Sequence, residues 1–227
     1  DIDLENGAFY YDSESNRGMF IGWGTDGARS DVFAHFEKFP EWSYEADGDV
    51  TSLAVSADGE YIVAGADIYN SNSDELYLFK KGSSTPLWTK TLGDNFRSVA
   101  ISGDGKYIVV GTDDSSPQKS VTLFGRSSSS PLWSYSTNDV VHCVAISADG
   151  EYIVAGSDTD SIYLFDKDSS TPLWTYETGD NVRSIAISAD GEYIVAGSMD
   201  NNVYLFNKDS STPLWSNGLS YDVSHVD

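Results

Sequence analysis

Short apolar runs recur along the chain, each four to six residues long and rich in Val, Ile, Tyr and Phe. Runs of this length and composition, bounded by Gly, Ser and Asp, are typical of β-strands. No segment shows a sustained helical period of apolar residues. The pattern therefore predicts an all-β protein built from many short strands.

The runs belong to a repeat whose last two copies are closely similar. Residues 145–176 and 186–217 share 24 of 32 positions at an offset of 41. A Pro-x-Trp element marks five copies, with spacings of 46, 45, 41 and 41 between the prolines, which are Pro40, Pro86, Pro131, Pro172 and Pro213. A period in the forties made of short strands predicts the blade of a β-propeller.

Each copy predicts four strands, which we name A to D in chain order. An Asp-Gly turn joins A to B, and its glycine can adopt the positive φ that a tight hairpin needs. The spacing of the last copy places Gly18 in the same turn of the degenerate first copy. Strand B is apolar on both faces, so we expect neighbouring blades to cover both. The repeated Trp opens strand D and is expected to pack against the neighbouring blade.

The copies predict a single domain over residues 1–227, a five-bladed propeller of four-stranded blades. The approximate repeat boundaries are 1–47, 48–93, 94–137, 138–179 and 180–220. Residues 221–227 align with the start of strand A and predict the beginning of a further A strand. We favour a tail that pairs with residues 1–4 and closes the ring. A cut through a longer array, and addition of the tail to the sheet of another copy, stay open.

This repeat resembles two known propeller families. Its period and order of strands and turns resemble WD-repeat propellers, and residues 164–179 (LFDKDSSTPLWTYETG) resemble the repeat of pyrroloquinoline-quinone-type propellers. The Trp-Asp dipeptide and the Gly-His element of WD repeats are absent from the sequence, as is the cofactor constellation of the quinone enzymes. The resemblance implies a propeller of the prokaryotic, non-enzymatic type that binds partners, and it transfers no catalytic residue.

The net charge of the chain limits the classes of molecule that it can bind. Thirteen Lys and Arg oppose 36 Asp and Glu, which gives a formal net charge of -23. A field of this sign repels phosphate backbones and anionic headgroups, so we expect no nucleic-acid partner. No apolar run is long enough to span a bilayer, and we expect no membrane insertion. The acidity is typical of a soluble surface in a salty setting, and we expect an extracellular or cell-surface location.

Few residues have the chemistry of a metal or catalytic site. Cys143 aligns with Ser52, Ser98 and Ser184, so we expect a small buried side chain and not a reactive thiol. The three histidines are far apart in sequence, and we expect no metal bound through nitrogen or sulfur. Calcium stays open as a cofactor at the oxygen-rich loops 113–115 and 158–160. Hydrolase, phosphate-binding and metalloprotease motifs are absent from the sequence, so we expect no enzyme.

The two ends of the blades differ in sequence. The A–B and C–D turns are nearly uniform, whereas the B–C loops vary in length: 25–31, 66–75, 112–120, 157–161 and 198–202. Loops on a rigid scaffold are free to diverge for binding, so we predict that the face of the B–C and D–A loops is the binding face. The alternative, to which we give equal weight, is that the B–C loops diverged because nothing binds them.

The start of strand A lies on the same face and carries our candidate binding residues: Asp49, Asn95, Arg97, His142, Asn181 and Arg183. Two arginines at one repeat position suggest an anionic ligand or a carboxylate partner. In the alternative, each Arg bonds an Asp of the adjacent loop. We expect a non-catalytic scaffold that binds a protein or glycan through this face; the alternative is a structural subunit that associates with copies of itself through its terminal strands.

Overall fold

The computed structural model describes residues 7–12, 17–22, 31–36, 39–68, 73–93, 96–113 and 120–226, with side chains from residue 41 onward apart from residue 96. Every regular element in these ranges is a β-strand, as the sequence predicted. Four sheets each contain four consecutive antiparallel strands. We call them blades 2 to 5, because they correspond to the second to fifth repeats.

The strands of the four blades have the following bounds. Blade 2 contains β5 (Asp49–Val55), β6 (Tyr61–Asp67), β7 (Glu75–Lys80) and β8 (Trp88–Thr91). Blade 3 contains β9 (Phe96–Ile101), β10 (Tyr107–Thr112), β11 (Ser120–Gly125) and β12 (Pro131–Ser136). Blade 4 contains β13 (Val141–Ile146), β14 (Tyr152–Ser157), β15 (Ser161–Asp166) and β16 (Trp174–Glu177). Blade 5 contains β17 (Val182–Ile187), β18 (Tyr193–Ser198), β19 (Asn202–Asn207) and β20 (Trp215–Gly218).

The first repeat forms two separate hairpins. These are β1 (Gly7–Asp12) with β2 (Arg17–Gly22), and β3 (Asp31–Phe36) with β4 (Phe39–Glu45). The prediction for Gly18 is wrong: this residue lies within β2 and pairs with Tyr11, and the last pair of the hairpin is Asp12 with Arg17. β2 and β3 lie side by side without joining one sheet.

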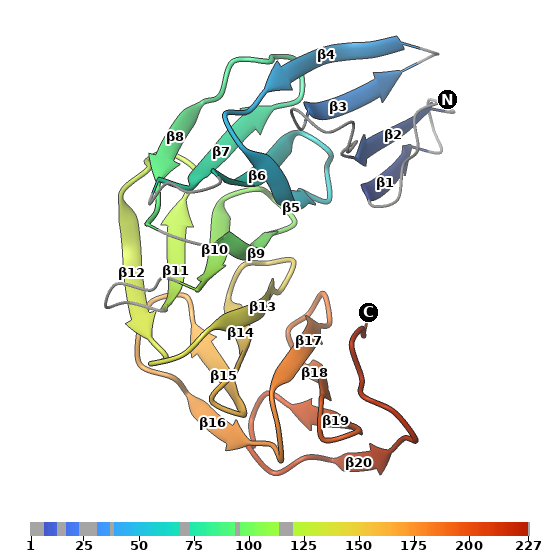
Figure 1. Ribbon diagram of the computed structural model, residues 1–227, viewed down its shortest axis with the longest axis vertical. Coiled ribbons are helices and arrows are strands. Elements are labelled where there is room, and N and C mark those ends of the chain that lie inside the picture. Colours follow the sequence, from blue (N-terminus) through green and yellow to red (C-terminus); the bar gives the residue numbers. More distant parts are fainter. Residues whose placement is uncertain are drawn as a thin grey trace.

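The blades follow one another along an arc (Figure 1). The first strand of each blade lies on the inner side of the arc and the fourth on the outer side, and the hairpin of β1 and β2 faces the C-terminal tail across an opening. The predicted pairing of the tail with residues 1–4 falls outside the described residues. Ring closure and the number of blades in a ring therefore stay predictions.

The core lies between successive blades. The central residues of β6, β10 and β14 are buried on both faces, which confirms the predicted cover of strand B. At each of four blade junctions the repeated Trp lies against the Phe of the next blade, with ring centroids 5.3–6.1 Å apart. The same indole N–H donates a hydrogen bond to a carbonyl in the next C–D turn, for example from Trp174 to Lys208 at 2.8 Å. The predicted role of the Trp is confirmed.

The A–B turns repeat one hydrogen-bond network. In blade 4, Ser147 Oγ donates to Asp149 Oδ1 at 2.6 Å, and the same oxygen accepts the N–H of Glu151 at 3.0 Å. The turn glycine has a positive φ, 76° at Gly150, and a Cβ there would lie 2.6 Å from the ring of Tyr107 in the preceding blade. Only glycine therefore satisfies both the turn and the junction.

The C-terminal tail lies on blade 5 in the position of the next innermost strand. Val223 fills the notch at Gly197, where a Cβ would be 2.5 Å from Val223 Cγ1, just as Val182 fills the notch at Gly156. The Val226 N–H donates to Ser184 Oγ at 2.8 Å, as the Val144 N–H does to Ser98 Oγ at 3.2 Å at the junction of blades 3 and 4. The tail thus lies beside blade 5 where the first strand of a further blade would begin.

Candidate functional site

The predicted binding residues lie where strand A begins, at the end of the blades that carries the B–C loops. Asp49 is the first residue of β5 and pairs with Asp67 across the strands. Arg97, His142 and Arg183 each occupy the second position of β9, β13 and β17. Asn181 directly precedes β17, and Asn95 lies outside the described residues.

Two of these residues meet at the junction of blades 4 and 5. Arg183 Nη1 lies 3.0 Å from His142 Nδ1 and also contacts His142 Nε2. Asp158, in the B–C turn of blade 4, joins them: its Oδ1 is 2.8 Å from His142 Nε2 and 3.6 Å from Arg183 Nη2. The group is a partly exposed ionic cluster that links three segments of chain.

Arg97 forms a separate ion pair in blade 3. Its Nη2 lies 2.6 Å from Asp113 Oδ2, in the B–C loop of the same blade. Both arginines therefore bond an Asp of a neighbouring loop, as the structural alternative predicted. Their side chains stay 44% and 32% exposed at Arg97 and Arg183, so a partner can still reach the guanidinium groups. An incoming anion must share them with Asp113 and Asp158.

Asn181 holds the B–C turn of its own blade. Its carbonyl accepts the N–H of Met199 at 2.9 Å, and Arg183 Nε lies 3.1 Å from Met199 Sδ. Asp200 in the same turn accepts hydrogen bonds from the Gly179 N–H at 2.8 Å and from Tyr204 Oη at 2.5 Å. Desolvation opposes its charge, but these hydrogen bonds outweigh it and lower the pKa of Asp200.

The described B–C turns, 157–161 and 198–202, are thus built by their own polar side chains and fixed in shape. Asp160 and Asn201 adopt positive φ values of 55° and 69° in them. Residues 25–30, 69–72 and 114–119 of the other predicted binding loops lie outside the described part of the chain.

The chemistry available at this face is ionic. Within the described residues, no three His, Cys, Asp or Glu side chains are placed to hold a metal ion. Asp158, one of the residues that kept calcium open, is directed at His142 and Arg183. Cys143 is buried, as predicted, and burial raises the pKa of its thiol to about 12, so the thiol stays protonated at neutral pH.

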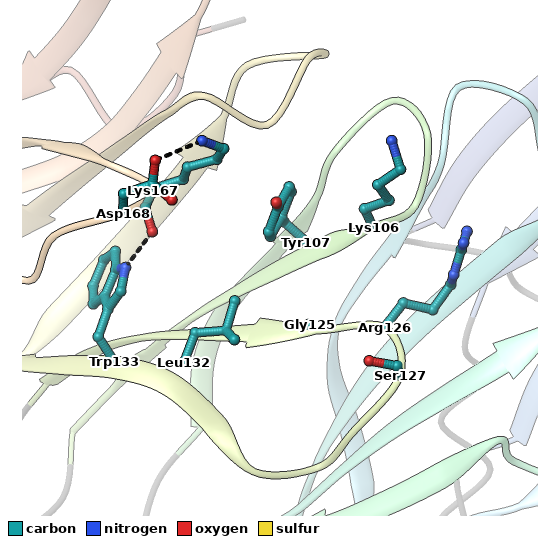
Figure 2. Close-up of a pocket in the computed structure, with 9 residues that line it drawn as sticks. All are labelled: Lys106, Tyr107, Gly125, Arg126, Ser127, Leu132, Trp133, Lys167 and Asp168. Carbon is teal, nitrogen blue, oxygen red and sulfur yellow. Dashed lines mark hydrogen bonds and ion pairs between the residues drawn. The ribbon is translucent and has the colours of Figure 1, made fainter.

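The sequence reasoning missed a pocket on the opposite face, where the A–B and C–D turns lie. It encloses about 540 Å³ at the outer junction of blades 3 and 4. Its lining residues are Lys106, Tyr107, Gly125, Arg126, Ser127, Leu132, Trp133, Lys167 and Asp168 (Figure 2). The available signal was that Lys106 and Gly125 depart from the repeat on a face whose turns otherwise look uniform.

Three segments of the chain match the model of a known repeat family. Residues 39–68, 129–166 and 170–207 match the family model described as WD domain, G-beta repeat. The last two segments each run from strand D of one blade to strand C of the next, β12–β15 and β16–β19. These matches support a WD-repeat family, whereas the pyrroloquinoline-quinone type is not confirmed. No curated protein sequence matches the chain.

The described residues contain no helix with the length and apolar character that a membrane crossing requires.

Proposed function

We propose that the protein is a non-catalytic scaffold that binds a protein partner through the face of its B–C and D–A loops. The observation that carries the proposal is the contrast between the two parts of each WD-type repeat. The junctions between blades repeat the same Trp-to-Phe contact and the same Trp hydrogen bond, whereas the B–C loops differ in length and chemistry. A fixed frame with variable loops is the usual architecture of a binding surface.

The ionic cluster supports this choice of face. Arg183, His142 and Asp158 present both signs of charge at one junction, on a chain whose net charge is -23. Mixed charges held by neighbouring loops favour specificity and orientation in a protein interface more than raw affinity. The turns that surround the cluster are already ordered, which reduces the entropic cost of binding.

The proposal is tested by cross-linking from two positions of one strand. Glu177 and Thr171 are both exposed and stand on either side of β16, Glu177 toward the B–C face and Thr171 in the C–D turn. A photo-reactive amino acid is placed at one or the other position in the cells that make the protein. We expect a discrete protein adduct from position 177 that depends on the ionic cluster, and any adduct from position 171 should be independent of it.

An arginine variant links the adduct to the cluster. Arg183→Ala removes the guanidinium from the cluster, and we expect the adduct at position 177 to fall at least about fivefold, because each lost charged contact contributes about 1 kcal/mol or more. Circular dichroism of the variant should match the parent. Absence of an adduct at position 177, or an adduct there that Arg183→Ala leaves unchanged, would contradict the proposal.

Association between copies through the terminal blade is a second candidate, supported by one observation. Trp215 repeats the junction Trp of the other blades, yet its side chain is 48% exposed on the outer face of blade 5. Tyr193 and Tyr221 on the same blade and tail are also exposed, at 50% and 83%. This face has the shape that blades 2 to 4 present to their neighbours.

Light scattering of the full chain tests the candidate. We expect species larger than one chain that disappear in a variant lacking residues 221–227, because these residues supply the innermost strand of the next blade. A monomeric full chain at high concentration, or unchanged assembly after the deletion, would exclude it.

A further inference from the structure

Several residues that line the pocket between blades 3 and 4 lack the ion pair and the turn hydrogen bond that the equivalent residues form in blades 4 and 5. In blades 4 and 5 a lysine of the C–D turn bridges to a glutamate before strand B: Lys167 Nζ lies 3.1 Å from Glu151, and Lys208 Nζ 3.2 Å from Glu192. In blade 3 the same two positions are Arg126 and Lys106. Two cations cannot form this bridge, so blade 3 has lost it.

Both side chains are turned to other partners. Lys106 Nζ lies 2.6 Å from Asp104 Oδ2, and its side chain remains 62% exposed. The Arg126 guanidinium lies 4.4 Å from the ring centroid of Tyr61, and its Nη1 donates to the Asp104 carbonyl at 3.2 Å. The lining of the pocket holds three cations, Lys106, Arg126 and Lys167, and one carboxylate, Asp168, an excess of positive charge on a strongly acidic chain that Asp104 outside the lining partly balances. General solubility does not explain it, since an acidic residue at position 106 would serve better.

The missing side chain at Gly125 leaves the space that forms the pocket. The equivalent residues in blades 4 and 5, Asp166 and Asn207, accept the backbone N–H two residues later at 2.8 and 3.0 Å and so fix the C–D turn. Gly125 lacks this bond. A Cβ at position 125 would point toward the Leu132 side chain at 3.8 Å, so any larger residue would enter the pocket.

The pocket therefore has an apolar floor and a cationic rim. Leu132 is 56% exposed on the floor, and Figure 2 shows Tyr107 between Lys167 on one side and Lys106 and Arg126 on the other. Lys167 is shared with Glu151 and with Asp168, at 3.1 and 2.8 Å. The volume lies in the range of small-molecule and peptide side-chain sites.

The aromatic residues favour a peptide over a sugar. The ring of Trp133 packs on Phe165 with centroids 5.3 Å apart, and its N–H bonds the Lys167 carbonyl at 2.7 Å. The ring of Tyr107 covers the turn glycine Gly150. Both rings are engaged within the protein, so the exposed apolar surface is the aliphatic side chain of Leu132, which suits an aliphatic residue better than a sugar ring.

We propose that this pocket binds an acidic–aliphatic peptide segment of a protein partner. A carboxylate of the segment lies between Lys106 and Arg126, and an aliphatic side chain fills the space over Leu132 that Gly125 leaves. This site lies on the face opposite the ionic cluster, so it is a second contact surface and does not depend on the function proposed above.

The probe is a fluorescein-labelled, end-blocked pentapeptide of alternating Glu and Leu, whose binding is measured by fluorescence anisotropy. Lys106→Glu and Gly125→Asp convert blade 3 to the residues that blade 4 carries as Glu151 and Asp166. Both substitutions restore structural bonds, so we expect a melting temperature equal to or above that of the parent. We expect each of them to weaken binding at least about tenfold, because Lys106→Glu replaces a cation by a charge that repels the peptide carboxylate and Gly125→Asp fills the space over Leu132.

Control ligands test the carboxylate contact and the aliphatic contact one at a time, and a sugar ligand tests the alternative to a peptide. Peptides with Gln for Glu, or with Ser for Leu, should each bind at least about tenfold more weakly. The Trp133 indole N–H resonance should shift on titration with the Glu-Leu peptide, and the Trp174 resonance should not. Absence of saturable binding, equal binding by the folded Lys106→Glu protein, or tighter binding of a uronic-acid trisaccharide than of the peptide would overturn the proposal.

Discussion

Trp174 and Trp215 are the same residue of the repeat in two different surroundings, and they give a direct measure of what a blade junction contributes. Trp174 is partly buried, its ring centroid lies 5.4 Å from that of Phe206, and its N–H bonds Lys208 at 2.8 Å. Trp215 is 48% exposed at the outer face of the last blade. Substitution of each by Ala compares a junction with an uncovered blade.

The expected costs follow from these contacts. Replacement of a buried Trp by Ala costs about 3–5 kcal/mol, of which the N–H bond accounts for about 1 kcal/mol and the ring pair for about 0.5–1.5 kcal/mol. Because Trp174 is only partly buried, we expect about 3 kcal/mol, which lowers the melting temperature of a chain of this size by about 6–12 °C. Trp215→Ala removes exposed surface and should cost about 0.5–1 kcal/mol.

Calorimetry at low protein concentration measures both melting temperatures. Trp174→Phe keeps the ring against Phe206 and removes the N–H, so it should cost about 1 kcal/mol and isolate the hydrogen bond. Equal losses for Trp174→Ala and Trp215→Ala would refute the reasoning, because the ring of Trp215 would then be covered in solution by a contact that the single chain does not provide.

Three further predictions concern the notch glycines, the buried thiol and the tail. Gly156→Ala should cost about 1–3 kcal/mol in urea unfolding, since its Cβ would lie 2.5 Å from a neighbouring valine methyl, whereas Gly82→Ala has open space and should be neutral. Burial raises the pKa of Cys143 from 9.0 to about 12, so its stabilising contribution is complete below pH 9.0 and is lost as the pH rises through the folded value; Cys143→Ser should flatten the fall in stability between about pH 8 and about pH 10, and an unchanged slope would contradict this. Val223→Asp places a charge in the notch and should make the tail sensitive to limited proteolysis while blade 5 stays protected; a resistant tail would show that the notch does not hold it.

Short motifs in the sequence were enough to predict the turns within the blades and the contacts between them. The Asp-Gly turns required glycines with positive φ, and the structure has them at Gly59, Gly105, Gly150 and Gly191. The Trp-to-Phe contacts were predictable because both residues keep the period. Gly18 was misplaced because the count backward from Pro40 assumed that the first copy keeps the spacing of the last, whereas its A–B hairpin has a different register.

The candidate site was predicted only in part, because it depends on contacts between blades. The repeat placed His142 and Arg183 at equivalent positions, but only the fold shows that they meet at one junction with Asp158. The pocket was missed for a related reason. Lys106 replaces a repeated Glu, and Gly125 stands at a position that varies between the repeats. Their meaning appears only when the bridge and the turn bond that blade 3 lacks are seen in blades 4 and 5.

The tail on blade 5 makes the protein separable into two parts that recognise each other. Val223 in the Gly197 notch and the Val226 N–H on Ser184 are contacts of side chain and backbone that a free peptide can also make. A chain cut after blade 5 and a synthetic peptide of residues 219–226 therefore form a complementing pair, like the fragments of a split reporter. Val141 and Val182 fill the notches at Gly111 and Gly156 in the same way, so the contact that holds the last strand also holds the first strands of blades 4 and 5.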